Sequence, residues 1–265
     1  MRRLITFSCG PDTLVGSLDA AAGTTGVVIV SGGNEARWGA HRGMAMLAAR
    51  LAAADVPVFR FDRRGVGDST GENRGYAGSG DDLAAAVGRL RSEQPQVQRI
   101  VGFGNCDAAT ALALFGRAAG VDALVLANPW VIEATSDALP PPSAIRARYA
   151  ERLRDPREWW RLLSGGVNIA KLVRGLRQVA APAAPSILAE QVAGALADWP
   201  PPTLLIAERD NTAIAFADAW RGPAFARVRE AARWRTRATD SHSFARAGDG
   251  DWLFDEVLAA VRAAR

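Results

Sequence analysis

The sequence predicts an α/β protein built on a twisted, mostly parallel β-sheet with helices on both faces. Short apolar runs rich in β-branched residues recur along the chain, and stretches with the apolar spacing of helices separate them. The runs are apolar at nearly every position, which is typical of strands buried on both faces. With 265 residues, 49% of them hydrophobic, the chain can form one well-buried core.

The expected strands and helices alternate along the chain. The predicted parallel strands are 25–30, 56–61, 98–103, 121–126, 203–207 and 232–237. The predicted helices are 44–51, 81–92, 107–115, 211–220 and 252–261. Ahead of them, residues 4–7 and 14–18 predict an antiparallel hairpin at one edge of the sheet.

Residues 129–200 interrupt this alternation with proline-rich and glycine-rich segments and with helical patterns. We interpret them as a helical cap inserted into a core domain formed by 1–128 and 201–265. An insertion at the carboxyl edge of such a sheet lies over the crevice where open α/β sheets bind ligands. Trp159, Trp160 and Leu163 are therefore predicted to contact the substrate, although they could equally attach the cap to the core.

Charge and composition indicate a soluble protein that acts on a small molecule. The net charge is +4 and the basic residues are scattered, which does not favour nucleic-acid binding. No segment has the apolar length of a membrane helix or the pattern of a signal peptide. Two distant cysteines give neither a disulfide framework nor a metal-binding spacing, so we expect a cytoplasmic protein without metal or cofactor. The sequence leaves its oligomeric state open.

Cys106 lies in a segment typical of a nucleophile elbow, a sharp turn between a strand and a helix. Such a turn holds its central residue in strained backbone geometry, so the residues two positions away must be small. Gly104 and Ala108 meet this requirement. Cys106 is therefore the candidate nucleophile, whereas Cys9 has no such context and is expected to be an inert buried thiol.

An activated thiol needs a base, and the base needs an acid that orients it. His242 follows the last predicted strand, the position of the base in the order nucleophile, acid, histidine. His41, the other histidine, is expected to be a polar loop or rim residue. Asp210, shortly after strand 203–207, is the predicted acid; Glu208 is the alternative, and helix capping is the other role open to Asp210.

The negative charge that develops on an attacked carbonyl oxygen is stabilised by two backbone N–H groups. The residue after the nucleophile, Asp107, is predicted to supply one of them. The other is predicted to come from Gly33 or Asn34, in the loop after strand 25–30, where glycine permits a close backbone approach. An ordinary strand-to-helix turn would also favour glycine at these positions.

The helix terminus and His242 are expected to favour a thiolate–imidazolium pair at Cys106. A thiolate can attack esters and thioesters directly, because it has no proton to lose in the transition state. The carboxylate of Asp107 adds a nearby negative charge and opposes this effect slightly.

Residues 62–69, Asp-Arg-Arg-Gly-Val-Gly-Asp-Ser, resemble the D-x-R-G-x-G-x-S loop of the α/β-hydrolase superfamily. The order of motifs from Ser31 to His242 fits that superfamily over nearly the whole chain. The resemblance implies the α/β-hydrolase fold and acyl chemistry, with Asp62 and Arg63 as structural residues that tie loops together.

Three further segments look like the exosortase A system-associated hydrolase 1 group. They are Val-Ser-Gly-Gly-Asn-Glu at 30–35, the Gly-Asn-Cys-Asp-Ala elbow, and the cap segment 152–160. That group is encoded beside exopolysaccharide and protein-sorting genes in Gram-negative bacteria. Two positions depart from the wider superfamily: Cys106 stands in place of serine, as in dienelactone hydrolases, and Ser31 stands where many relatives have histidine.

These observations predict a cofactor-independent acyl hydrolase, an esterase or thioesterase, with a Cys-His-Asp triad and an acyl-cysteine intermediate. An acyltransferase that uses the same acyl-cysteine is the alternative, because a site that excludes water suppresses hydrolysis. A non-catalytic binding protein on the same fold is a third possibility.

Overall fold

The structure is a computed structural model that describes residues 1–132 and 186–264, and in this part of the chain the strands form one eight-stranded sheet. The sheet order is β1-β2-β4-β3-β5-β6-β7-β8. The strands are β1 (Arg2–Cys9), β2 (Asp12–Asp19), β3 (Thr25–Val30), β4 (Val58–Phe61), β5 (Arg99–Asn105), β6 (Ala123–Ala127), β7 (Thr203–Ala207) and β8 (Arg233–Arg237). The neighbouring strands β4, β3, β5, β6, β7 and β8 all pair in parallel. At one edge, β1 pairs with β2 and β2 pairs with β4, both antiparallel.

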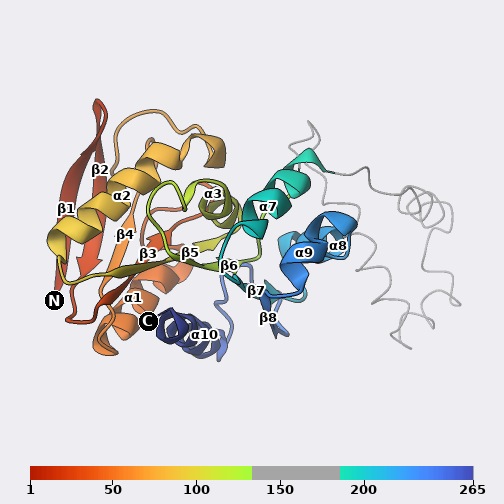
Figure 1. The fold of residues 1–265 in the computed structure, drawn as a ribbon. Helices are drawn as coiled ribbons and strands as arrows, with labels where there is room; N and C mark the ends of the chain where they lie inside the picture. The colour runs from red at the N-terminus through yellow and green to blue at the C-terminus, as the bar shows by residue number, and fades with distance from the viewer. Residues whose placement is uncertain (133–185, 265) are drawn as a thin grey trace, which may run out of the picture.

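Helices cover both faces of this sheet. The α-helices are α1 (Gly43–Ala53), α2 (Gly80–Glu93), α3 (Asp107–Phe115), α7 (Ile187–Ala197), α8 (Asn211–Trp220), α9 (Ala226–Arg229) and α10 (Asp249–Ala263). In Figure 1, α2 and α3 lie on one side of the sheet, and α1 and α10 lie together on the other. No helix in the described ranges has the length and apolar character needed to cross a membrane. The predicted α/β-hydrolase fold, with its mostly parallel sheet, is confirmed.

Neighbouring residues of the central strands point to opposite faces and build two separate hydrophobic layers. In β3, Val28 and Val30 pack beneath α2 and α3, while Val27 and Ile29 pack against α1 and α10. All four side chains are at most 1% exposed. Burial on both faces explains why the strand is apolar without interruption.

The boundaries differ from the predicted ones by a few residues, and some shifts have a visible cause. β4 begins at Val58 rather than at residue 56, because Pro57 has no N–H to donate and contributes only its carbonyl, which accepts from the Val27 N–H at 2.9 Å. α10 begins at Asp249 rather than at residue 252. The Asp249 carboxylate binds Arg237 at 2.8 Å and the Thr239 hydroxyl at 2.7 Å, which fixes the first turn of the helix to the end of β8.

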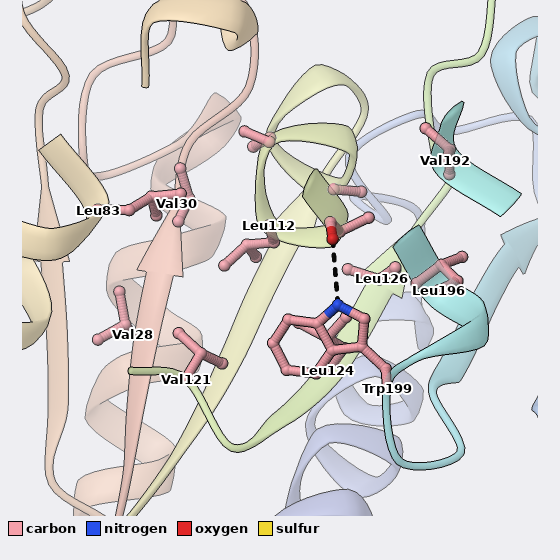
Figure 2. Packing of buried hydrophobic residues seen from close by; sticks show 14 of the residues in the cluster. Val28, Val30, Leu83, Leu112, Val121, Leu124, Leu126, Val192, Leu196 and Trp199 are labelled. Carbon is pink, nitrogen blue, oxygen red and sulfur yellow. Dashed lines mark hydrogen bonds between the residues drawn. The ribbon is translucent and has the colours of Figure 1, made fainter. Parts of the chain in front are cut away.

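α7 lies within the range predicted as the cap, yet it packs as part of the core. Its buried residues Val192 and Leu196 belong to the same cluster as Leu112 of α3. Figure 2 shows the indole of Trp199, just beyond α7, against this cluster, with its N–H donating to the carbonyl oxygen of Ala113 at 3.1 Å. The predicted substrate contacts Trp159, Trp160 and Leu163 lie outside the described residues.

Trp199 should therefore contribute to the global stability of the protein. We expect Trp199→Ala to lower the free energy of unfolding by about 3–5 kcal/mol, because it removes a large buried side chain. Trp199→Phe should cost about 1–2 kcal/mol, since it mainly leaves the Ala113 carbonyl without its donor.

Urea unfolding followed by circular dichroism measures both effects. Met46→Ala is the control, because this side chain is 58% exposed and its loss should change stability by less than about 0.5 kcal/mol. Unchanged global unfolding in Trp199→Ala would mean that α7 and Trp199 belong to a separable unit.

Candidate active site

Cys106 occupies a strained turn between β5 and α3. Its backbone angles are φ 62° and ψ −128°, a region that non-glycine residues rarely adopt. The Cys106 N–H donates to the carbonyl of Ala127 at 3.0 Å, and the Cys106 carbonyl accepts from the N–H of Trp130 at 3.2 Å. The last residue of β6 and the chain that follows it therefore hold the turn from both sides of the cysteine.

Small residues around the turn allow this geometry. A Cβ on Gly104 would lie 2.8 Å from the carbonyl carbon and oxygen of Ala108, closer than real side chains come. A Cβ on Gly32 would lie 2.6 Å from the Asn105 carbonyl oxygen and 3.3 Å from the Cβ of Cys106. The turn is therefore tight, as predicted, and the loop after β3 runs directly beside the cysteine.

His242 and Asp210 come together at the same edge of the sheet. The Nδ1 atom of His242 lies 3.0 Å from Oδ2 of Asp210, and that same oxygen accepts from the N–H of Ala213 at 3.0 Å. One oxygen of Asp210 thus caps α8 and also binds the imidazole. In the described ranges no hydrogen bond joins His242 to Glu208, whose side chain is exposed.

The electrostatic surroundings favour a protonated His242. Burial alone would lower the pKa of the imidazole, but hydrogen bonds with Asp210 and Cys106, and the negative charges of both partners, outweigh it and raise the pKa to about 10. Both side chains therefore act on the imidazole. At neutral pH His242 is a cation between two acidic groups.

The loop expected to bind an oxyanion is held by the carboxylate of Asp107. Its Oδ1 accepts from the Gly33 N–H at 2.5 Å, and its Oδ2 accepts from Arg63 at 3.1 Å. Arg63 also donates to the Gly33 carbonyl at 2.5 Å, so the Gly33 residue is bound on both its N–H and its C=O. The side chain of the other candidate, Asn34, accepts from the amide of Asn73 at 2.8 Å.

The backbone N–H of Asp107 has a different environment. Asp107 is the first residue of α3, and no hydrogen-bond partner is found for its N–H among residues 1–132 and 186–264. The N–H groups of a first helical turn have no partner within the helix and are free to bind a negative charge.

Asp62 and Arg63 tie loops together, as the resemblance implied. The Asp62 carboxylate is fully buried, forms an ion pair with Arg37 and accepts from the N–H of Asp68 at 3.1 Å. Arg63 is 4% exposed and links Asp107 to the hydroxyl of Ser79 at 3.2 Å. The contribution of Arg37 was not predicted, because nothing in its local sequence distinguishes it from the other arginines.

The other cysteine and the other histidine have different surroundings. Cys9 is buried, its thiol lies 3.5 Å from a carboxylate oxygen of Asp82, and burial, followed by the charge of Asp82, raises its pKa to about 11. It therefore stays a thiol at neutral pH. His41 is exposed in a short turn with φ 51°. No group of three or more potential metal ligands occurs in the described part of the chain.

Solved structures with the same fold include several hydrolases. The chain is similar to the esterase Pf2001 of Pyrococcus furiosus (17% identity, 99% of this chain and 90% of that chain, TM-score 0.64) and to the α/β hydrolase GrgF of Penicillium sp. (18%, 100% and 99%, 0.66). It is also similar to the thioesterase domain of the curacin biosynthetic pathway (12%, 97% and 99%, 0.60).

The sequence itself has a family match. No curated protein matches the chain in sequence. The family model described as "Alpha/beta hydrolase family" matches residues 27–264, which include most of β3, all of β4 to β8 and the whole of the site around Cys106. The chain therefore belongs to the alpha/beta hydrolase family.

Proposed function

We propose that the protein is a cofactor-independent acyl hydrolase that cleaves esters or thioesters with Cys106 as nucleophile, His242 as base and acid, and Asp210 as the orienting acid. The observation that carries the proposal is the bond of His242 to Asp210 at 3.0 Å beside the strained turn of Cys106, whose side chain, with Asp210, raises the pKa of the imidazole. Solved structures named as an esterase and as a thioesterase have the same fold and support this class of substrate. Within the family, we propose the exosortase A system-associated hydrolase 1 group as the closer affiliation, on the motifs described above.

Catalysis would begin from the thiolate–imidazolium pair. The sulfur of Cys106 attacks the acyl carbonyl carbon and a C–S bond forms, while the carbonyl π electrons move onto the oxygen. The N–H of Asp107, which has no partner among the described residues, is placed to receive that oxygen. The tetrahedral intermediate then collapses, the bond to the alcohol or thiol breaks, and His242 gives its proton to the leaving group.

Water completes the cycle. The now neutral His242 takes a proton from a water molecule as the water oxygen attacks the acyl-cysteine. The C–S bond breaks, the carboxylic acid leaves, and the thiolate–imidazolium pair is restored. The His242 side chain is 37% exposed, which supports access of water to the imidazole.

Gly33 and Asn34 are the proposed sources of the second oxyanion N–H. For Gly33 to act, its N–H has to exchange the carboxylate of Asp107 for the substrate oxygen. Arg63 already binds that carboxylate and would retain it during the exchange. The carboxylate of Asp107 thus lies beside the proposed oxyanion hole, and the buried guanidinium of Arg63 balances its negative charge.

Turnover assays separate the candidate functions. Short-chain and long-chain acyl-coenzyme A thioesters and p-nitrophenyl esters are offered with and without acceptor alcohols, and free acid and transferred acyl groups are quantified. Release of acid that depends on Cys106 supports the hydrolase, and acyl transfer in preference to acid release would replace it with the acyltransferase. If no substrate is turned over and mass spectrometry detects no acyl-enzyme, the non-catalytic binding protein is the remaining candidate.

The identity of the acid can be tested with matched variants. Asp210→Asn should lower kcat by roughly 10²–10⁴-fold, because the imidazole loses its negative partner and its fixed tautomer. Its thermal midpoint should change little, since asparagine caps a helix as well as aspartate does. Glu208→Gln makes the same chemical change two residues away, on a side chain with no hydrogen bond to His242 within the described ranges. An equal loss in both variants, or a larger loss in Glu208→Gln, would contradict the assignment.

Cys106 should react with iodoacetamide at pH 6. The pKa of His242 is raised to about 10, so the imidazole is a cation at all lower pH values and stabilises a neighbouring thiolate until the pH rises through about 10. His242→Ala should slow alkylation at pH 6 by about tenfold or more, with a smaller difference at pH 10.

Peptide mass spectrometry measures this labelling and contains its own control. Cys9, whose pKa is raised to about 11, should stay unlabelled at pH 6 in both proteins. Rates for Cys106 that do not differ between the wild type and His242→Ala would argue against the pair.

A further inference from the structure

Asn128, directly after β6, lies at the centre of the three loops that carry the proposed triad. Its side chain is fully buried, and its backbone has φ 41°, a left-handed conformation. It is not adjacent to Cys106, Asp210 or His242 in the sequence. The end of β6 comes beside the ends of β5 and β7 because these strands are its parallel neighbours in the sheet.

The amide of Asn128 contacts each of these loops. Its nitrogen donates to the side-chain oxygen of Asn105 and to the backbone carbonyl of His242, both at 3.1 Å. Its oxygen accepts from the backbone N–H of Ala207 at 2.8 Å. Asn105, the residue before the nucleophile, donates to the same His242 carbonyl at 3.0 Å.

These contacts require both a donor and an acceptor on one short side chain. Aspartate would keep the acceptor for Ala207 but would lose the donor to His242. Glutamine is longer by one methylene in a fully enclosed place. Asparagine is also among the few residues that tolerate left-handed backbone angles. The position thus calls for an amide of this length.

We propose that Asn128 is a positioning residue that holds the backbone of His242 at a set distance from Cys106 and Asp210. This inference rests on the proposed function, because it assigns Asn128 to the same triad. The His242 carbonyl accepts from two amide groups, Asn105 and Asn128, one on the nucleophile turn and one joined to the strand that precedes the acid. The two amides therefore fix the histidine loop relative to both partners of the imidazole.

Asn128 acts through geometry alone. It has no titratable group, and the titratable groups that act on the imidazole are Asp210 and Cys106. Displacing the His242 backbone would lengthen both interactions of its ring. The pH dependence of the site should then change even though no ionisable group has been removed.

Asn128→Gly is the decisive variant, because glycine adopts φ 41° without strain and keeps the turn while it removes the amide. We expect kcat/KM for an acyl thioester to fall by about 10- to 100-fold, the scale of loss for a small misplacement of catalytic groups. Alkylation of Cys106 by iodoacetamide at pH 6 should slow by a similar factor. The NMR titration midpoint of His242, assigned with a His41→Gln background, should move down toward the ordinary histidine value.

The control is Gln94→Ala, which also removes a buried amide but lies after α2, toward the opposite end of the strands. Within residues 1–132 and 186–264, that side chain donates to the Glu93 carbonyl and accepts from Gln96. Its loss should lower thermal stability and leave the alkylation rate and the His242 titration as in the wild type. The same pattern in Asn128→Gly, lower stability with unchanged chemistry at the site, would overturn the proposal.

Two further outcomes are decided by the same measurements. If Asn128→Gly does not fold, Asn105→Ala removes one of the two donors to the His242 carbonyl, and an unchanged alkylation profile in that variant overturns the proposal. If the wild type hydrolyses no ester or thioester, the proposed function fails. Alkylation and the NMR titration still measure whether Asn128 holds His242 beside Cys106, and a shift in both would support it.

Discussion

The backbone strain at Cys106 is the constraint on which the rest of the site depends. A non-glycine residue in such a conformation costs roughly 1–3 kcal/mol and persists only when its surroundings enforce it. Here β5 and α3 fix the two ends of the turn, and Gly104 and Gly32 leave room for it. The last residue of β6 binds the N–H of the cysteine, and the chain after β6 binds its C=O. The turn is therefore a product of the whole sheet rather than of its own five residues.

A second strained residue lies at the end of the neighbouring strand. Asn128 has φ 41°, and Ala127, immediately before it, accepts the N–H of Cys106. Two adjacent parallel strands are thus followed by left-handed residues that are not glycine, and the backbone of Cys106 is hydrogen-bonded to residues on both sides of Asn128. Such residues cluster where structure supports function; Asn128 is hydrogen-bonded to the backbone of His242, and the Cys106 side chain acts on its imidazole.

The fold could be predicted from the sequence because burial on both faces leaves a local signal, an uninterrupted apolar run in every central strand. Cys106 and Asp210 could be selected because each follows such a run, and His242 because it follows the last predicted strand, where the order nucleophile, acid, histidine places the base. Whether they act in catalysis stays a prediction, and the contacts of Trp159 and Trp160 fall outside the described residues.

The sequence could not indicate which polar side chains bind each other across long distances in the chain. A buried asparagine such as Asn128 and a buried arginine such as Arg37 cannot be told from surface residues by their type alone. The bond between the Asp107 carboxylate and Gly33 is of the same kind, because it joins two loops 74 residues apart.

The double use of one oxygen of Asp210 has a consequence for how this protein could evolve. The atom that binds His242 also caps α8, so natural selection for a stable fold alone would preserve the aspartate. If the proposed triad operates, a descendant that lost catalysis could keep Asp210 indefinitely while Cys106 and His242 drifted. When homologous chains are sorted into active and inactive members, the aspartate is therefore a poor marker, and the cysteine and histidine together are the informative pair.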